Sequence, residues 1–200
     1  GTDYNNGSTV SDITISAGAT TGTVSFTPTE DSMYEGNETA IVAIDTVSGG
    51  SATENGTQAV TITITDNESA PTVTLTSSAS SIAENSGSSL TLTATLSGTT
   101  DEDVTVSLST SGTGTEGTDY GMVSDITISA GQTTGTATFT PTDDSTYEGN
   151  ETGIIAVGTV SGGSATENGT QTVTLTINEN ESAPTVTLTS SASSVSEDGS

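Results

Sequence analysis

The chain has 200 residues, of which 26 are acidic and none is lysine, arginine, histidine or cysteine, so its formal net charge at pH 7 is −26. Without basic side chains it has no surface to meet a nucleic acid backbone or an anionic lipid headgroup, and without cysteine it has neither disulfides nor thiolate metal sites. Only 35 residues are Leu, Ile, Val or Phe, a share typical of a disordered chain at this charge.

The order of the residues contradicts that compositional expectation. Apolar residues alternate with Thr and Ser over many short segments, as the two faces of a β-strand require, and Thr itself favours strands. No segment has helical spacing, and none approaches the roughly 20 apolar residues of a membrane helix. No signal peptide is present, and the first residue is Gly1, which suggests a piece of a longer protein. The pattern predicts an all-β fold.

Residues 1–69 are predicted to be the C-terminal part of a repeat, because the chain resembles itself at a fixed offset. The segment 10–87 recurs as 123–200, 113 residues later, with about three-quarters of its positions identical. The motif GTDY opens the chain and returns at Gly117, preceded the second time by strands that the first copy lacks. This period matches one β-sandwich domain of about 100 residues and is too long for a solenoid unit.

Residues 70–182 are predicted to be the complete repeat, a seven-stranded antiparallel sandwich of the immunoglobulin-like kind. Turn residues separate its strands, and Asn168-Gly169 is typical of a tight hairpin. The strands are expected near Thr72 to Thr76, Ser88 to Leu96, Asp103 to Ser109, Ser124 to Ser129, Thr133 to Thr140, Glu151 to Val160 and Gln171 to Asn178.

Residues 183–200 are predicted to hold the first strand of the next repeat. The link before it runs only from Asn180 to Pro184, and Pro184 fixes its own φ and biases Ala183 towards extended geometry. A link this short and stiff predicts neighbouring domains that sit end to end.

The densest acidic segment lies between the fifth and sixth predicted strands. It reads TDDSTYEGNE from Thr142 to Glu151 and returns in the first copy from Thr29 to Glu38. Since the chain has no basic side chain to neutralise these carboxylates, a hard divalent cation with 6–8 oxygen ligands is the available partner. Acidic loops that only keep the chain soluble are the alternative.

At this point the motifs AENSG from Ala83, GTDY from Gly117, DDSTYEGNE from Asp143 and the acidic exit after the last strand together resemble a Calx-beta domain. The resemblance spans the whole repeat and implies calcium ligands clustered at one end of an immunoglobulin-like sandwich. Carried over by position, the implied ligands are Glu84, Asp119, Asp143, Asp144, Glu148, Glu151 and Glu179, with a backbone carbonyl of Thr146, and in the first copy Asp3, Glu30, Asp31, Glu35, Glu38 and Asp66.

The exit segment departs from the family pattern, which often has a run of aspartates there. This chain has Asn178, Glu179 and Asn180 instead, and Gly149 and Asn150 replace acids common in the regulatory exchanger domains. Fewer acids imply fewer or weaker ions and favour structural calcium over finely tuned sensing.

Aromatic and asparagine residues have simpler interpretations. Tyr120 and Tyr147 are expected to fill the end of the core beside the acidic loops, and Phe139 is expected inside it. Seven of the ten Asn residues begin an Asn-X-Ser/Thr sequence, which makes glycans a candidate partner.

The function that fits best is a structural unit of a secreted or cell-surface, calcium-stiffened adhesin stalk or filament, whose partners are neighbouring repeats and like chains. An enzyme is disfavoured because His, Cys and every cationic transition-state stabiliser are missing, although paired carboxylates could serve glycoside hydrolysis. A calcium sensor and a ligand-binding adhesin tip are two further candidate functions, but neither needs repeats this uniform.

Overall fold

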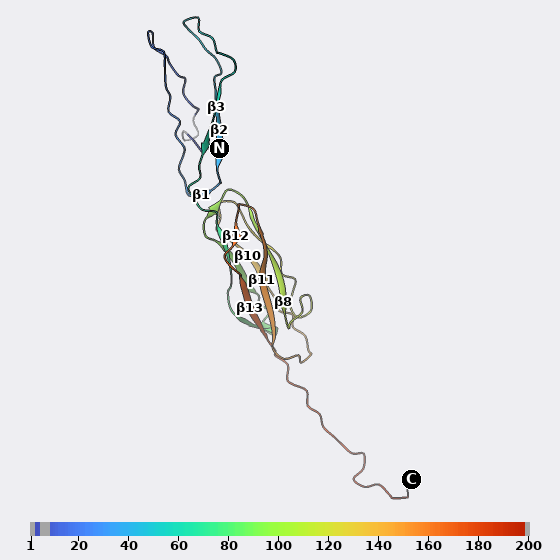
Figure 1. Ribbon diagram of the computed structural model, residues 1–200. Helices are drawn as coiled ribbons and strands as arrows, with labels where there is room; N and C mark the ends of the chain where they lie inside the picture. The colour runs from blue at the N-terminus through green and yellow to red at the C-terminus, as the bar shows by residue number, and fades with distance from the viewer. Residues whose placement is uncertain (1–2, 5–8, 199–200) are drawn as a thin grey trace.

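The computed structural model describes residues 3–4 and 9–198, and Gly1 and Thr2 of the first GTDY motif therefore lie outside the described residues. The described chain forms an elongated molecule of two units placed end to end, followed by an extended C-terminal segment (Figure 1). Apart from one short 3-10 turn, Glu84–Ser86, its regular elements are strands. The fold is all-β, as the alternation predicts.

The second unit is a sandwich of two sheets. Most neighbouring strands are antiparallel, and two short edge strands, β12 and β5, pair in parallel. In spatial order, one sheet contains β10 (Thr134–Phe139), β6 (Leu90–Leu96), β4 (Thr72–Ser77) and β12 (Thr166–Glu167). The other contains β5 (Ser81–Ala83), β13 (Thr172–Asn178), β11 (Glu151–Ser161), β8 (Val104–Gly112) and β9 (Ile126–Ile128).

All seven strands expected from the alternation are present within a few residues of the expected bounds. Sequence analysis missed β5, β12 and β7 (Thr99–Thr100), which have only two or three residues and thus no measurable period. The expected hairpin at Asn168-Gly169 is wrong: the turn joins β12 to β13, which belong to different sheets.

The core lies between the two sheets and follows the alternation. On β6, Leu90, Leu92, Ala94 and Leu96 are buried, while the intervening Thr residues lie on the other face. Tyr120 stacks on Phe139, with ring centroids 4.6 Å apart, and closes the core towards the acidic loops. The expected core positions of Tyr120 and Phe139 are therefore confirmed.

Tyr147 does not belong to this core, contrary to the expectation. Its side chain is 46% exposed, in the loop between β10 and β11. Tyr120, stacked on Phe139, already closes the core at this end.

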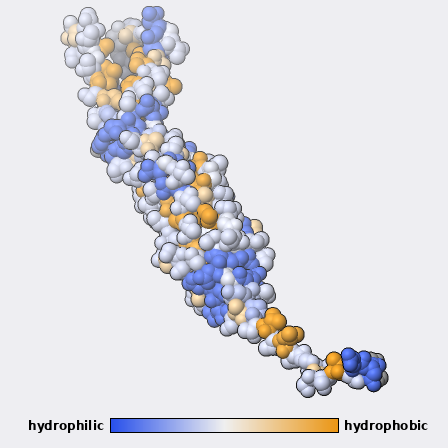
Figure 2. Space-filling view, turned by 60° about the horizontal axis from the view of Figure 1, so that its bottom comes forward, coloured by the Kyte–Doolittle hydropathy of each residue, from blue (hydrophilic) through white to orange (hydrophobic). Residues whose placement is uncertain are grey.

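The first unit has the strands β1 (Met33–Tyr34), β2 (Glu38–Ala43) and β3 (Ala59–Ile64), and β2 and β3 form an antiparallel pair. Its apolar side chains are open to solvent: Ile41 is 71% exposed and Val60 is 63% exposed. In the second unit the equivalent strands, β11 and β13, contact β8 and β4. The described residues before β1 form no strand that could take these places. Orange apolar side chains on this unit are visible in Figure 2.

The C-terminal segment forms no strand over residues 184–198, although the sequence predicts one. Leu188 is fully exposed. Its equivalent in the second unit is Leu75 on β4, which pairs with β6 and β12. Among the described residues no strand lies beside this segment, so its strand pattern has no partner to pair with.

The described residues contain no helix long and apolar enough to span a membrane.

Replacing Phe139 with Ala should destabilise the second unit strongly, because the ring is fully buried and stacked on Tyr120. Loss of a buried aromatic side chain costs about 3–5 kcal/mol, a large share of the roughly 5–15 kcal/mol typical of a folded domain. Urea denaturation followed by circular dichroism measures the change. Met122→Ala is the control, since that side chain is 77% exposed. Equal stability of the two variants would contradict this description of the core.

Candidate metal centre

Carboxylates gather in three groups of three within the described part of the chain. In each group every residue offers one oxygen, and these oxygens lie within 4.8 Å of one another. Two groups lie at one end of the second unit and one lies in the first unit. They are Glu84, Glu179 and Glu181; Asp119, Glu148 and Glu151; and Asp3, Glu35 and Glu38.

The group of Asp119, Glu148 and Glu151 is positioned by the GTDY turn and by the start of β11. The carboxylate of Asp119 accepts the backbone N–H of Thr115 at 2.6 Å, and its carbonyl accepts the N–H of Thr142 at 2.9 Å. These bonds fix Asp119 against the loop that carries Glu148. Burial and then the charge of Asp119 raise the pKa values of Glu148 and Glu151 above their ordinary range.

The group of Glu84, Glu179 and Glu181 joins the first turn of the unit to its exit. Glu84 begins the 3-10 turn after β5 and is one of only two buried polar residues among those described. Burial, followed by the charge of Glu179, raises the pKa of Glu84. Asp143 and Asp144 also act on Glu84, so these two predicted ligands lie beside this group.

Glu179 accepts hydrogen bonds from both the acidic loop and the exit segment at this end of the second unit. One of its oxygens accepts the N–H groups of Glu148 and Gly149 at 2.6 and 2.8 Å, and the other accepts those of Asn180 and Glu181 at 3.0 Å. Backbone donors, that of Glu181 first and that of Glu148 second, lower the pKa of Glu179 to about 2. The exit of β13 is thereby tied directly to the acidic loop.

Glu181 is the residue of this group that sequence analysis missed. One oxygen accepts the side-chain amide of Asn180 at 2.7 Å, but Oε2 is buried without a hydrogen-bond partner. Interaction with the neighbouring carboxylate of Glu179, followed by burial, raises the pKa of Glu181 to about 6. The signal was available: Glu181 is the next acid after Glu179 in the exit segment, and Glu68 occupies the equivalent position in the first copy.

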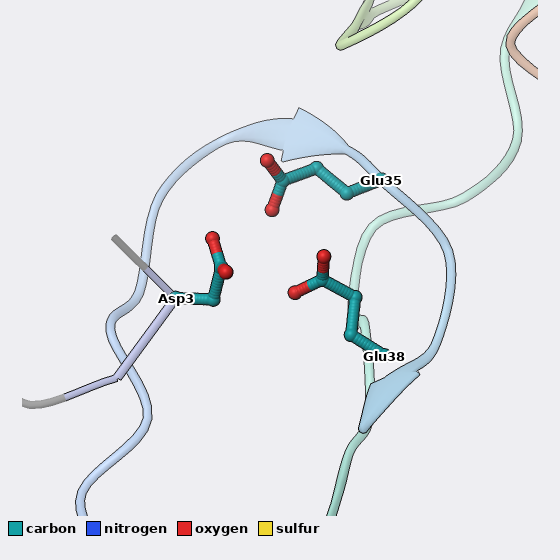
Figure 3. Close-up of side chains that lie close together, drawn as sticks. All are labelled: Asp3, Glu35 and Glu38. Atoms are coloured by element: carbon teal, nitrogen blue, oxygen red, sulfur yellow. The ribbon is translucent and has the colours of Figure 1, made fainter. Parts of the chain in front are cut away.

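The first unit repeats the arrangement. Asp3, Glu35 and Glu38 point towards one another in Figure 3, and they line a cavity of about 300 Å³ together with the other predicted ligands of this copy, Glu30, Asp31 and Asp66. Asp66 takes the place of Glu179, because its carboxylate accepts the N–H groups of Glu35 and Gly36 at 2.8 and 2.6 Å. Burial raises the pKa of Asp66, but these backbone donors and that of Glu68 lower it further, so the net shift is downward.

Three predicted ligands have local partners and belong to none of the three groups. The carboxylates of Asp144 and Asp31 accept the N–H of the residue two positions later, Thr146 at 2.6 Å and Met33 at 2.8 Å. Glu30 accepts the side-chain amide of Asn67 at 2.9 Å. Thr146 is exposed, and its carbonyl stays a prediction as a ligand.

The donor set fits calcium. All donors are carboxylate oxygens, and oxygens on opposite sides of one calcium ion, each about 2.4 Å from it, are about 4.8 Å apart. The unpartnered buried oxygen of Glu181 is a ligand position that no protein donor satisfies. No Lys, Arg or His exists in the chain to neutralise these groups, and hydrophilic patches lie near the junction of the units and at the far end of the second (Figure 2).

Comparison with known proteins identifies the family of the chain. The family model described as Calx-beta domain matches residues 1–68 and again residues 66–181. Among solved structures, the apo-form Calx CBD1 domain matches with 18% sequence identity and a TM-score of 0.47, covering 57% of this chain and 100% of that one. No curated protein matches the chain.

Replacing Glu181 with Gln should weaken calcium binding and flatten its pH dependence. In the wild type, calcium must displace a proton below pH 6, so affinity should fall as the pH drops through about 6. The variant has no such proton to displace at this position. Titration calorimetry at pH 5.5, 6.5 and 7.5 measures both effects.

The same substitution weakens calcium binding but should raise the stability of the metal-free protein at neutral pH. Because the pKa of Glu181 is higher in the folded protein, its protonated form stabilises the fold. This stabilisation is fully present below the pKa of the unfolded chain, 4.5, and is lost as the pH rises through about 6. Glu181→Gln should therefore melt higher than the wild type at pH 7 in chelator. Glu197→Gln removes a charge from the exposed tail and serves as the control. If Glu197→Gln lowers the calcium affinity or raises the melting temperature as much as Glu181→Gln does, both effects come from net charge alone.

Proposed function

Because the chain belongs to the Calx-beta domain family, whose domains are calcium-binding modules, we propose that it is a structural unit of an extracellular stalk or filament stiffened by calcium. The observation that carries the proposal is the position of the acids. Two of the three groups stand at the exit end of the second unit, around Glu179 and Glu181, only a few residues before Pro184.

Calcium held there would supply positive charge between segments that otherwise repel one another. In the second unit the residues to hold it are Glu84, Asp119, Glu148, Glu151, Glu179 and Glu181, with Asp143 and Asp144 beside them. The chain's own contribution is to preorganise these groups: Glu179 already fixes the acidic loop to the exit strand through backbone hydrogen bonds. An ion that binds only the folded state also stabilises it.

The near-identity of the repeats supports a spacer role. A spacer needs many equal units, each adding length and the same joint, whereas a sensor or a ligand-binding tip is needed once or twice. Secretion or display at the cell surface, adhesion, and association with neighbouring repeats or like chains belong to this proposal. So does the absence of catalysis, since no nucleophilic Cys, His or cationic stabiliser exists in the sequence.

Glycans are compatible with this role. The six paired acceptor positions, Asn37, Asn55, Asn67, Asn150, Asn168 and Asn180, are all exposed. Asn37 and Asn150, however, accept the backbone N–H of Asp66 and Glu179 with their side-chain oxygens, so these two already have a structural role.

Calcium should lengthen and stiffen an array of these repeats. Small-angle scattering on three tandem repeats should give a larger maximum dimension with millimolar calcium than with chelator, because calcium neutralises the repulsion at each joint. Circular dichroism in both conditions controls for unfolding. Equal dimensions with folded domains in both conditions would refute the stalk mechanism, and calorimetry without any calcium binding would remove its basis.

A further inference from the structure

The two units meet in a direct contact, at the place where β1 lies in Figure 1. β1 of the first unit pairs in parallel with β7 of the second, so that Met33 lies opposite Thr99 and Tyr34 opposite Thr100. The N–H of Asp101 donates to the carbonyl of Tyr34 at 3.4 Å. Main-chain pairing of this kind adds a strand from one body to the sheet edge of another. The junction is therefore a strand addition.

Two side chains extend this contact. The hydroxyl of Thr99 donates to the carbonyl of Ser32 at 3.2 Å. The terminal methyl group of Met33 lies beside Gly131, where a side-chain carbon would come 3.8 Å from it. Gly131 has a φ of +73°, in the left-handed region that favours glycine. Any larger side chain on this turn would thus be within reach of Met33. None of these contacts between the units involves a carboxylate.

The receiving surface is held in shape by hydrogen bonds within the second unit. Thr100 is only 1% exposed, its hydroxyl donates to the carbonyl of Glu102 at 2.9 Å, and it accepts the N–H of the same residue at 3.0 Å. The N–H of Gly131 donates to the carbonyl of Thr100 at 2.8 Å. The N–H of Ala130 donates to the carboxylate of Asp103 at 2.8 Å. β7 and the turn at Gly131 therefore form one surface whose shape does not depend on the first unit.

The segment that docks there is held by hydrogen bonds within the first unit. The N–H of Met33 donates to the carboxylate of Asp31 at 2.8 Å. The N–H groups of Glu35 and Gly36 donate to the carboxylate of Asp66 at 2.8 and 2.6 Å. β1 is thus fixed on both sides by its own unit. Two preformed parts meet at the junction, so little ordering is needed for them to pair.

A second attachment lies in the link between the units. Residues 65–71 connect β3 to β4, and Pro71 at the end of this link is fully buried. Its carbonyl accepts the N–H of Thr166 in the second unit at 3.1 Å. Domains joined by a link alone are expected to move relative to one another. Here the link and the β1–β7 pair hold the units through two different segments, which opposes swinging about the link.

We propose that β7 and the turn at Gly131 are a receiving site for the preceding repeat of the same chain. The β1 segment of that repeat adds to this site as a strand and so sets the direction of one domain relative to the next. This inference goes beyond the proposed function, because the receiving site works through hydrogen bonds and one methionine contact and needs no ion. Calcium at the acidic groups would narrow the motion of a joint that already has a preferred direction.

The test uses the full 200-residue chain and the variant Gly131→Leu. The matched control is Gly169→Leu, because Gly169 has a φ of +66° and nothing lies within 4 Å of a side-chain carbon there. The backbone strain is therefore alike, but only Gly131 lies beside the first unit. Because the chain has no cysteine, Thr61→Cys and Thr174→Cys place one spin label at equivalent exposed strand positions of the two units. Double electron–electron resonance measures the distances between the labels, and circular dichroism checks that each variant is folded.

The wild type should show a single distance peak both in chelator and with calcium, and the peak should be narrower with calcium. Gly131→Leu should lose this single peak, and Gly169→Leu should keep it. Met33→Ala should broaden the peak, because the contact with the turn is lost. The double variant of Met33→Ala and Gly131→Leu should be narrower than either single variant, since leucine fills the space that methionine leaves.

Equal distributions in Gly131→Leu and Gly169→Leu would overturn the receiving site, as would a folded wild type without a preferred distance in chelator. Should Gly131→Leu not fold, a Met33→Ala distribution identical to that of the wild type overturns it as well. In these cases the proposed function stands if calcium still narrows the distribution. A wild type with a single peak but no calcium binding in calorimetry would instead refute the proposed function and support the receiving site.

Discussion

The structure depends on one electrostatic constraint: carboxylates converge at the ends of the units, and the chain contains no cationic side chain to meet them. Buried or crowded carboxylates must be neutralised by protons, by hydrogen-bond donors or by a metal ion. The first two are visible here, and the third is what the remaining acids require. Backbone N–H groups lower the pKa of Glu179, the neighbouring Glu179 carboxylate raises the pKa of Glu181, and burial raises the pKa values of Glu84 and Glu151.

In this arrangement backbone hydrogen bonds set the conformation of the acidic loop, and the remaining acids are left to hold an ion. Glu179 and Asp66 occupy equivalent places and bind the backbone of the acidic loop in the same way, so the loop conformation exists before any ion binds. The other acids of each group then surround a site whose shape is already set. Preorganisation of this kind reduces the ordering that an ion must impose. The small apolar core ends at the Tyr120–Phe139 stack, and the hydrogen-bonded acidic loops lie directly beyond it.

Sequence analysis predicted the fold well because β-structure leaves a period of two along the chain, and the segments around all seven predicted strands carry it. It failed where a strand is too short to show the period, as in β7, and where a strand needs a partner, as in residues 184–198. Tyr147 was misplaced because an aromatic residue beside a domain end looks like core, whereas the stack of Tyr120 on Phe139 closes the core there.

The site was predicted in part. Glu84, Asp119, Glu148, Glu151 and Glu179 came from family positions, and the structure brings them together in two groups. Glu181 lies outside the family positions, although it follows Glu179 closely in the acidic exit segment. Only the fold shows that it belongs to the site, because the fold brings it beside Glu84, which is far away in the sequence, and leaves one of its oxygens buried without a hydrogen-bond partner.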